Sequence, residues 1–182
     1  MVMRIDFSQP RVMAILNVTP DSFFAGSRTF DAAAIERRVA QALDQGADII
    51  DVGGYSSRPG ADDVSPEEAW RRVAAGVAAV RRSSPEAAVS VDTFRASVVE
   101  RVCERFGEVI VNDISAGALD PSMPAVVARL GVPYVAMHMR GNPASMQSLV
   151  DYRQDIVIEV CAYFRRRVAE LQAAGIRPEN II

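Results

Sequence analysis

The most constraining feature of the sequence is the alternation of short apolar, β-branched runs with longer segments of helical periodicity. The runs that we expect to form strands occupy residues 12–16, 48–52, 88–91, 109–112 and 133–137. Helical patterns follow them at residues 32–45, 65–82, 95–106, 120–131 and 153–174. Strands that alternate with helices predict right-handed βα units and a parallel sheet, so the fold class is α/β.

Two parallel architectures fit this alternation, a (β/α)8 barrel and an open doubly wound sheet. The pair Gly53-Gly54 does not form a GxGxxG fingerprint, so dinucleotide binding is unsupported. A complete barrel needs about 250 residues, whereas this chain has 182 and its last residues, 180–182, look like the opening of a sixth strand. We expect a TIM barrel truncated to about five βα units plus the start of strand six, with residues 1–182 as one domain.

Composition excludes several functions. All 20 basic residues are arginine, so Schiff-base chemistry on a lysine is impossible within this chain. A net charge of −3 argues against a nucleic-acid partner or an anionic membrane. Arg4 and Asp6 interrupt any signal peptide, and no apolar run approaches the ~20 residues of a membrane helix. A cytoplasmic location is predicted, with Cys103 and Cys161 as buried, inert thiols.

Polar and glycine-rich clusters follow every predicted strand. They begin at Asn17, Gly53, Asp92, Asn112 and Met137. In a parallel barrel the carboxyl ends of the strands meet at one rim, where the active sites of such barrels lie. The clusters therefore predict an enzyme of the barrel type, without identifying its reaction.

Asp92 and Asn112 are the sharpest pair in these clusters. A carboxylate only accepts hydrogen bonds and an amide both donates and accepts, so together they could clamp a ring with N–H donors and acceptors. Alternatively, Asp92 caps the following helix. Asn17 could hold Mg²⁺ together with a substrate phosphate, or it could shape a turn with its neighbours.

The remaining candidates have weaker signals. Ser57, Arg58 and Pro59 offer a hydroxyl, a guanidinium fork for phosphate and a stiff backbone, or they form an ordinary loop. Met137 could be an adaptable pocket wall or barrel core. Asp113 and His138 are interpreted as structural, since His138 has no acid or nucleophile in a recognisable array.

Five motifs carry a resemblance to a known family. They are ILNVTPDSF (15–23), GADIIDVGGYSSRPGA (46–61) with VSPEE (64–68), SVDT (90–93), VNDISAG (111–117) and MHMRGNPASMQ (137–147). Through them the sequence resembles dihydropteroate synthase from about residue 11 to residue 182. The resemblance implies a (β/α)8 barrel that condenses 7,8-dihydropterin-6-ylmethyl diphosphate with p-aminobenzoate in folate biosynthesis. It also implies a sulfonamide target.

The resemblance assigns a role to each candidate residue. Asn17 would belong to the Mg²⁺ and diphosphate site, and Asp92 would face the pterin ring and stabilise a developing cation. The pterin pocket would also be lined by Asn112, Ile114 and Met137. The diphosphate and p-aminobenzoate would be covered by Phe23, Ser57, Arg58 and Pro59.

The sequence departs from the family in two ways. Ala25 stands where family members commonly have an acidic residue, which questions how the first loop closes. The family's Asp-Pro-Gly segment, its pterin-contacting lysine and its Ser-Arg region come from later strands, so the chain is expected to carry roughly half of the site. Two alternatives stay open, a pterin-binding methyltransferase barrel and a non-catalytic pterin-binding remnant. The expected partners are small-molecule substrates, and the expected assembly is a homodimer.

Overall fold

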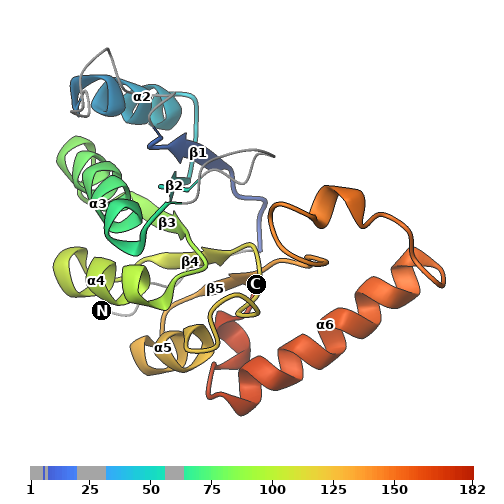
Figure 1. The fold of residues 1–182 in the computed structure, drawn as a ribbon. Helices are drawn as coiled ribbons and strands as arrows, with labels where there is room; N and C mark the ends of the chain where they lie inside the picture. The colour runs from blue at the N-terminus through green and yellow to red at the C-terminus, as the bar shows by residue number, and fades with distance from the viewer. Residues whose placement is uncertain (1–5, 7, 20–31, 56–63) are drawn as a thin grey trace.

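Five parallel strands form one sheet in the computed structural model, which describes residues 6, 8–19, 32–55 and 64–182 (Figure 1). The strands are β1 (Met13–Asn17), β2 (Ile49–Gly53), β3 (Ala88–Asp92), β4 (Ile110–Asp113) and β5 (Tyr134–Ala136). All of their pairings are parallel. Each predicted strand is present, with bounds that differ by one or two residues.

The order of the strands decides between the two predicted architectures. It runs β1-β2-β3-β4-β5, so every strand lies beside its neighbours in the chain. A doubly wound sheet reverses direction at a switch point, and this sheet has none. The five strands therefore form an arc of a (β/α)8 barrel. A parallel bridge between Tyr134 and Ile181 confirms that a sixth strand begins beside β5.

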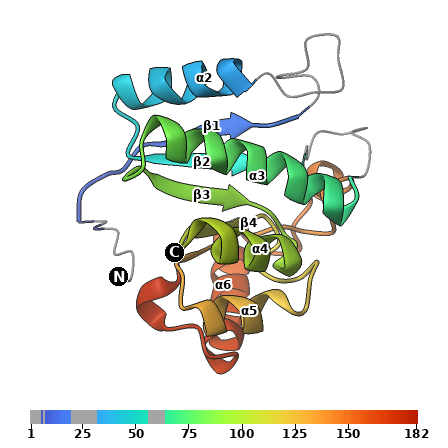
Figure 2. The same ribbon diagram turned by 90° about the vertical axis from the view of Figure 1, so that its left-hand side faces the viewer.

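Helices follow the strands in the predicted alternation. They are α2 (Ala32–Asp44), α3 (Pro66–Ser83), α4 (Ala96–Phe106), α5 (Met123–Leu130) and α6 (Ile156–Ala173). Short 3-10 turns lie at Met146–Ser148 and Pro178–Asn180. In Figure 2, α2, α3, α4 and α5 succeed one another along the outer side of the sheet. Among the described residues, no helix is both long and apolar enough to cross a membrane.

Two helices, α5 and α6, begin about three residues later than the periodicity predicts. Asp155 accepts hydrogen bonds from the Val157 and Ile158 amides, so α6 begins at Ile156. Asp120 binds the amide and hydroxyl of Ser122 and does not itself open α5. The prediction for the thiols is wrong at Cys161, which is exposed on α6, and Cys103 is only half-buried.

Successive side chains along each strand point alternately to the two faces of the sheet. Val52, Val89 and Val91 are buried in the cluster that joins the sheet to α3 and α4. Gly76 lets α3 approach closely, because a Cβ there would lie 2.5 Å from a methyl carbon of Val52. The residues between these valines point to the opposite, concave face, which is the barrel interior.

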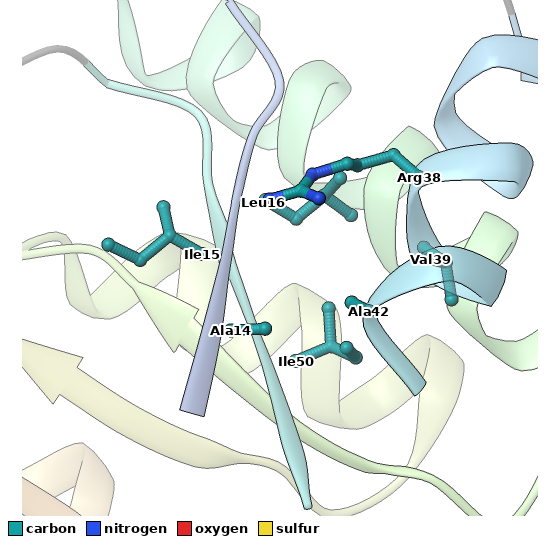
Figure 3. Close-up of a pocket in the computed structure, with 7 residues that line it drawn as sticks. All are labelled: Ala14, Ile15, Leu16, Arg38, Val39, Ala42 and Ile50. Atoms are coloured by element: carbon teal, nitrogen blue, oxygen red, sulfur yellow. The ribbon is translucent and has the colours of Figure 1, made fainter. Parts of the chain in front are cut away.

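Figure 3 shows the two faces at β1. Leu16 and Ile50 point toward Val39 and Ala42 of α2, around a depression that is too narrow to hold a ligand. Ile15 points the other way and is 62% exposed. The concave face at the β1 edge is therefore apolar and open.

Candidate functional site

Four residues at the carboxyl ends of β1 to β4 form one row across the concave face. The strand register pairs Asn17 with Gly53, Gly53 with Asp92, and Asp92 with Asn112. Side chains at the same register of a parallel sheet point to the same face. The predicted convergence of Asn17, Asp92 and Asn112 is confirmed.

Gly53 keeps the row open between two of these side chains. A Cβ at this position would lie 3.0 Å from Asn17 Oδ1 and 3.4 Å from Asp92 Oδ2. The adjacent Gly54 has a different role, because a Cβ there would lie 2.9 Å from the carbonyl oxygen of Ala69 on α3. The two glycines therefore serve close packing on opposite sides, one facing the site and the other facing a helix.

Asp92 is the most perturbed acid of the row. Its carboxylate is half-buried and has no hydrogen-bond partner among the described residues. Burial, together with the negative charges of Asp51 and Asp113, raises the pKa of Asp92 from 3.8 to about 7. A carboxyl group whose pKa is displaced in this way, at the mouth of a barrel, is typical of a functional site.

The alternative reading of Asp92 as a helix cap is wrong. The first amide of α4, that of Ala96, donates to Asp120 Oδ2 at 2.8 Å. The preceding amide, that of Arg95, donates to the Thr93 hydroxyl at 3.2 Å. Asp92 is therefore free of a capping role and faces the concave side of the sheet.

Asn112 is held by a residue that the sequence analysis did not identify. Its side-chain amide donates to Asp51 Oδ2 at 3.1 Å. Asp51 lies in the middle of β2 and is 5% exposed. Burial raises the pKa of Asp51, and the side chains of Ser90 and Asn112 offset part of that effect. The signal in the sequence is that Asp51 lies two residues before Gly53, on the same face of the strand.

Asp113 is structural, as predicted. This fully buried carboxylate accepts hydrogen bonds of 2.8 Å from the amides of Ser115 and Gly117. It also accepts from the hydroxyls of Ser115 and Tyr134 at 2.8 Å. Four bonds to one carboxylate hold the turn after β4 against β5. That turn carries Ile114, which is half-buried beside the row.

Met137 and His138 directly follow β5. Met137 is 38% exposed at the open side of the five-stranded arc, and its roles as a pocket wall or as barrel core both stay predictions. His138 lies in an aromatic cluster, with its ring centroid 4.7 Å from that of Tyr163 and 6.2 Å from that of Tyr152. This packing supports the structural interpretation of His138.

Some of the predicted residues cannot be placed. Phe23, Ser57, Arg58 and Pro59 lie outside the described residues, and so does Ala25. The roles that the resemblance gives them stay predictions.

The sequence of nearly the whole chain matches one protein family. Residues 13–182 fit the profile of the pterin-binding enzymes. The chain belongs to the pterin-binding enzyme family. The barrel fold that the sequence predicts agrees with this membership.

Curated relatives and solved structures agree with this membership. The dihydropteroate synthase of Escherichia coli K12 is 40% identical over 178 residues, which are 98% of this chain and 62% of the relative. That of Haemophilus influenzae is 39% identical, and this chain covers 63% of it. The Yersinia pestis dihydropteroate synthase, solved in complex with a sulfonamide drug, has a TM-score of 0.85 at 34% identity, over 97% of this chain and 63% of that structure.

A fourth relative is a solved structure with a small molecule. The Xanthomonas albilineans dihydropteroate synthase with 4-aminobenzoic acid has a TM-score of 0.79 at 36% identity, over 96% of this chain and 60% of that structure. The chain thus spans about three fifths of each of these four relatives.

Proposed function

We propose that the chain supplies the pterin-binding side of a dihydropteroate synthase, which condenses 7,8-dihydropterin-6-ylmethyl diphosphate with p-aminobenzoate. The observation that carries this proposal is the row of Asn17, Gly53, Asp92 and Asn112 on the concave face. The similarity to several dihydropteroate synthases supports it, and the chain matches them over more than nine tenths of its own length.

The side chains of the row suit a flat ring with both donors and acceptors. The ionised Asp92 carboxylate accepts N–H donors of the pterin, and Asn112 both donates and accepts. In the reaction the bond between the pterin methylene carbon and the diphosphate oxygen breaks, and a bond to the p-aminobenzoate nitrogen forms. A fixed carboxylate in a site that excludes water stabilises positive charge that develops on the pterin between these events.

Asn17 fits a magnesium site that is completed by the substrate. Its exposed side-chain oxygen ends β1 beside Gly53, and Mg²⁺ usually takes few protein ligands together with phosphate oxygens. Within the described ranges, no group of three or more acidic, His or Cys side chains could hold a metal alone. When bound, Mg²⁺ neutralises the charge of the leaving diphosphate.

The resemblance extends the proposal to further residues. Arg58, Ser57, Pro59 and Phe23 would cover the diphosphate and p-aminobenzoate, and Ile114 and Met137 would line the pterin pocket. The assembly we propose is a homodimer, and a cytoplasmic location stays a prediction of the sequence.

The role of Asn17 makes the proposal testable in the native gene product. Asn17→Ala removes a metal-directed oxygen and should raise the Mg²⁺ concentration for half-maximal dihydropteroate formation about tenfold, since one polar contact to a charged group is lost. The measurement is a magnesium titration of initial rates at fixed substrate concentrations.

The control is a substitution that removes another side-chain amide, far from the site. Gln45→Ala changes an exposed side chain just after α2 and should leave the magnesium dependence unchanged. A magnesium titration of Asn17→Ala that superimposes on those of the native protein and the control would remove Asn17 from the metal site.

A further inference from the structure

The carboxylate of Asp51 lies one layer below the row and has no assigned role. The register places it beside Ile15 on β1 and Ser90 on β3, two residues deeper in the barrel than Gly53. We propose that Asp51 is a positioning residue that orients the Asn112 amide so that its oxygen faces the pterin. This inference rests on the proposed function.

The chemistry of the contact fixes the direction of the amide. An ionised carboxylate only accepts hydrogen bonds, so Asp51 Oδ2 can bind the nitrogen of Asn112 and never its oxygen. The hydrogen bond of 3.1 Å therefore sets Nδ2 toward Asp51 and directs Oδ1 away from it. An asparagine at position 51 would accept from Nδ2 or donate to Oδ1 equally well, so the amide of Asn112 could adopt both orientations.

The burial of Asp51 carries an energetic cost. Its oxygen Oδ2 accepts from Asn112, whereas the buried Oδ1 has no well-formed hydrogen bond among the described residues, although the Ser90 side chain favours the ionised form. A buried carboxylate with an incompletely bonded oxygen costs free energy, part of which an uncharged residue of the same shape would avoid. A destabilising acid at the base of a binding site is typical of residues retained for function.

Asp51 also acts on Asp92 through its charge. Asp51 from β2 shares the concave face with Asp92, whereas Asp113 from β4 is buried on the other side of the sheet. The negative charges of both residues raise the pKa of Asp92. Removal of the Asp51 charge should therefore lower the pH at which Asp92 ionises.

Asp51→Asn in the native gene product tests the inference, with 7,8-dihydropterin as the probe in titration calorimetry. We expect affinity to fall about tenfold, the scale of one misdirected hydrogen bond, while the thermal midpoint stays equal or rises. The midpoint of the pH dependence of binding should also move to lower pH. Asp48→Asn, the same change at the exposed residue just before β2, should bind like the native protein.

A measurement without ligand separates this inference from the proposed function. In ¹⁵N spectra the Asn112 side-chain amide should give one environment in the native protein and two in Asp51→Asn. Unchanged affinity and a single environment in the variant would overturn the positioning role while leaving the proposed function intact. A fall in thermal midpoint that accounts for the lost binding would make Asp51 structural. No binding by the native protein would overturn the proposed function and this inference with it.

Discussion

Asp92→Asn is expected to weaken dihydropterin binding by about 1.5–3 kcal/mol, the scale for a hydrogen bond to a charged group. The variant keeps the shape of the side chain but loses the charge and one acceptor. The substitution breaks no hydrogen bond within the described part of the chain, because none of these residues bonds to the Asp92 carboxylate. Calorimetric titration of the native gene product and the variant with 7,8-dihydropterin measures the difference.

The pH dependence gives this prediction a second readout. Binding to pterin N–H donors needs the ionised carboxylate, and the pKa of Asp92 in the free protein is about 7. Affinity should therefore fall as the pH drops below about 7 in the native protein, because a proton must first be released. The variant should lack this decline, since it has no group to ionise at position 92.

The free energy of unfolding should depend on pH in the opposite direction to the binding affinity. The folded protein holds a proton on Asp92 that the unfolded chain releases near the ordinary pKa of 3.8. The contribution of the protonated Asp92 to the free energy of unfolding is therefore complete below about pH 4, and it is lost as the pH rises through 7. Asp92→Asn should match or exceed the native stability at pH 8. A variant that binds as tightly as the native protein at every pH would show that Asp92 does not contact the ring.

Residues 1–182, produced as a separate polypeptide, should self-associate. Val12 is 58% exposed and Ile15 is 62% exposed at the β1 edge of the sheet, where no described strand pairs with β1. Unpaired strand edges next to exposed apolar side chains drive association. Sedimentation equilibrium at tens of micromolar should give a weight-average mass at least twice that of the monomer, and turnover should be absent because the family's later segments are missing.

A single charge on the open face should reduce this association. Ile15→Lys places an ammonium group on the concave face without touching the packing of Leu16 against α2. The same charge at an exposed position outside this face, in Gln45→Lys, should leave association unchanged. A monomeric native fragment, or equal association in both variants, would show that the open face does not drive contact between copies.

Local patterns were enough to predict the fold and the centre of the site. The β-branched runs and helical periodicity predicted the five strands and five α-helices of the described chain but not its two 3-10 turns, and the strand ends predicted that Asn17, Asp92 and Asn112 converge. The structural role of Asp113 also followed, since an acid directly after a polar strand end can serve the turn that follows. These features depend on residues close together in sequence or on the rule that parallel strands end at one rim.

The features that local patterns missed depend on residues far apart in sequence. The cap of α4 comes from Asp120, 24 residues after the Ala96 amide that it accepts from. Asp51 reads as an isolated charge within an apolar strand, and its contact with Asn112 spans 61 residues. Cys161 lies on a helix whose neighbouring residues, Ile156 to Ile158, are themselves exposed, so apolar neighbours in sequence did not imply burial.

We propose that this chain contributes the pterin site of a dihydropteroate synthase. The most direct test of this proposal incubates the native gene product with 7,8-dihydropterin-6-ylmethyl diphosphate, Mg²⁺ and isotope-labelled p-aminobenzoate, and detects the product by mass spectrometry. We expect labelled dihydropteroate and an equal amount of diphosphate, with formation strongly reduced in Asp92→Asn. Tight binding of the dihydropterin without any labelled product, under conditions where a bacterial dihydropteroate synthase turns over, would contradict the proposal.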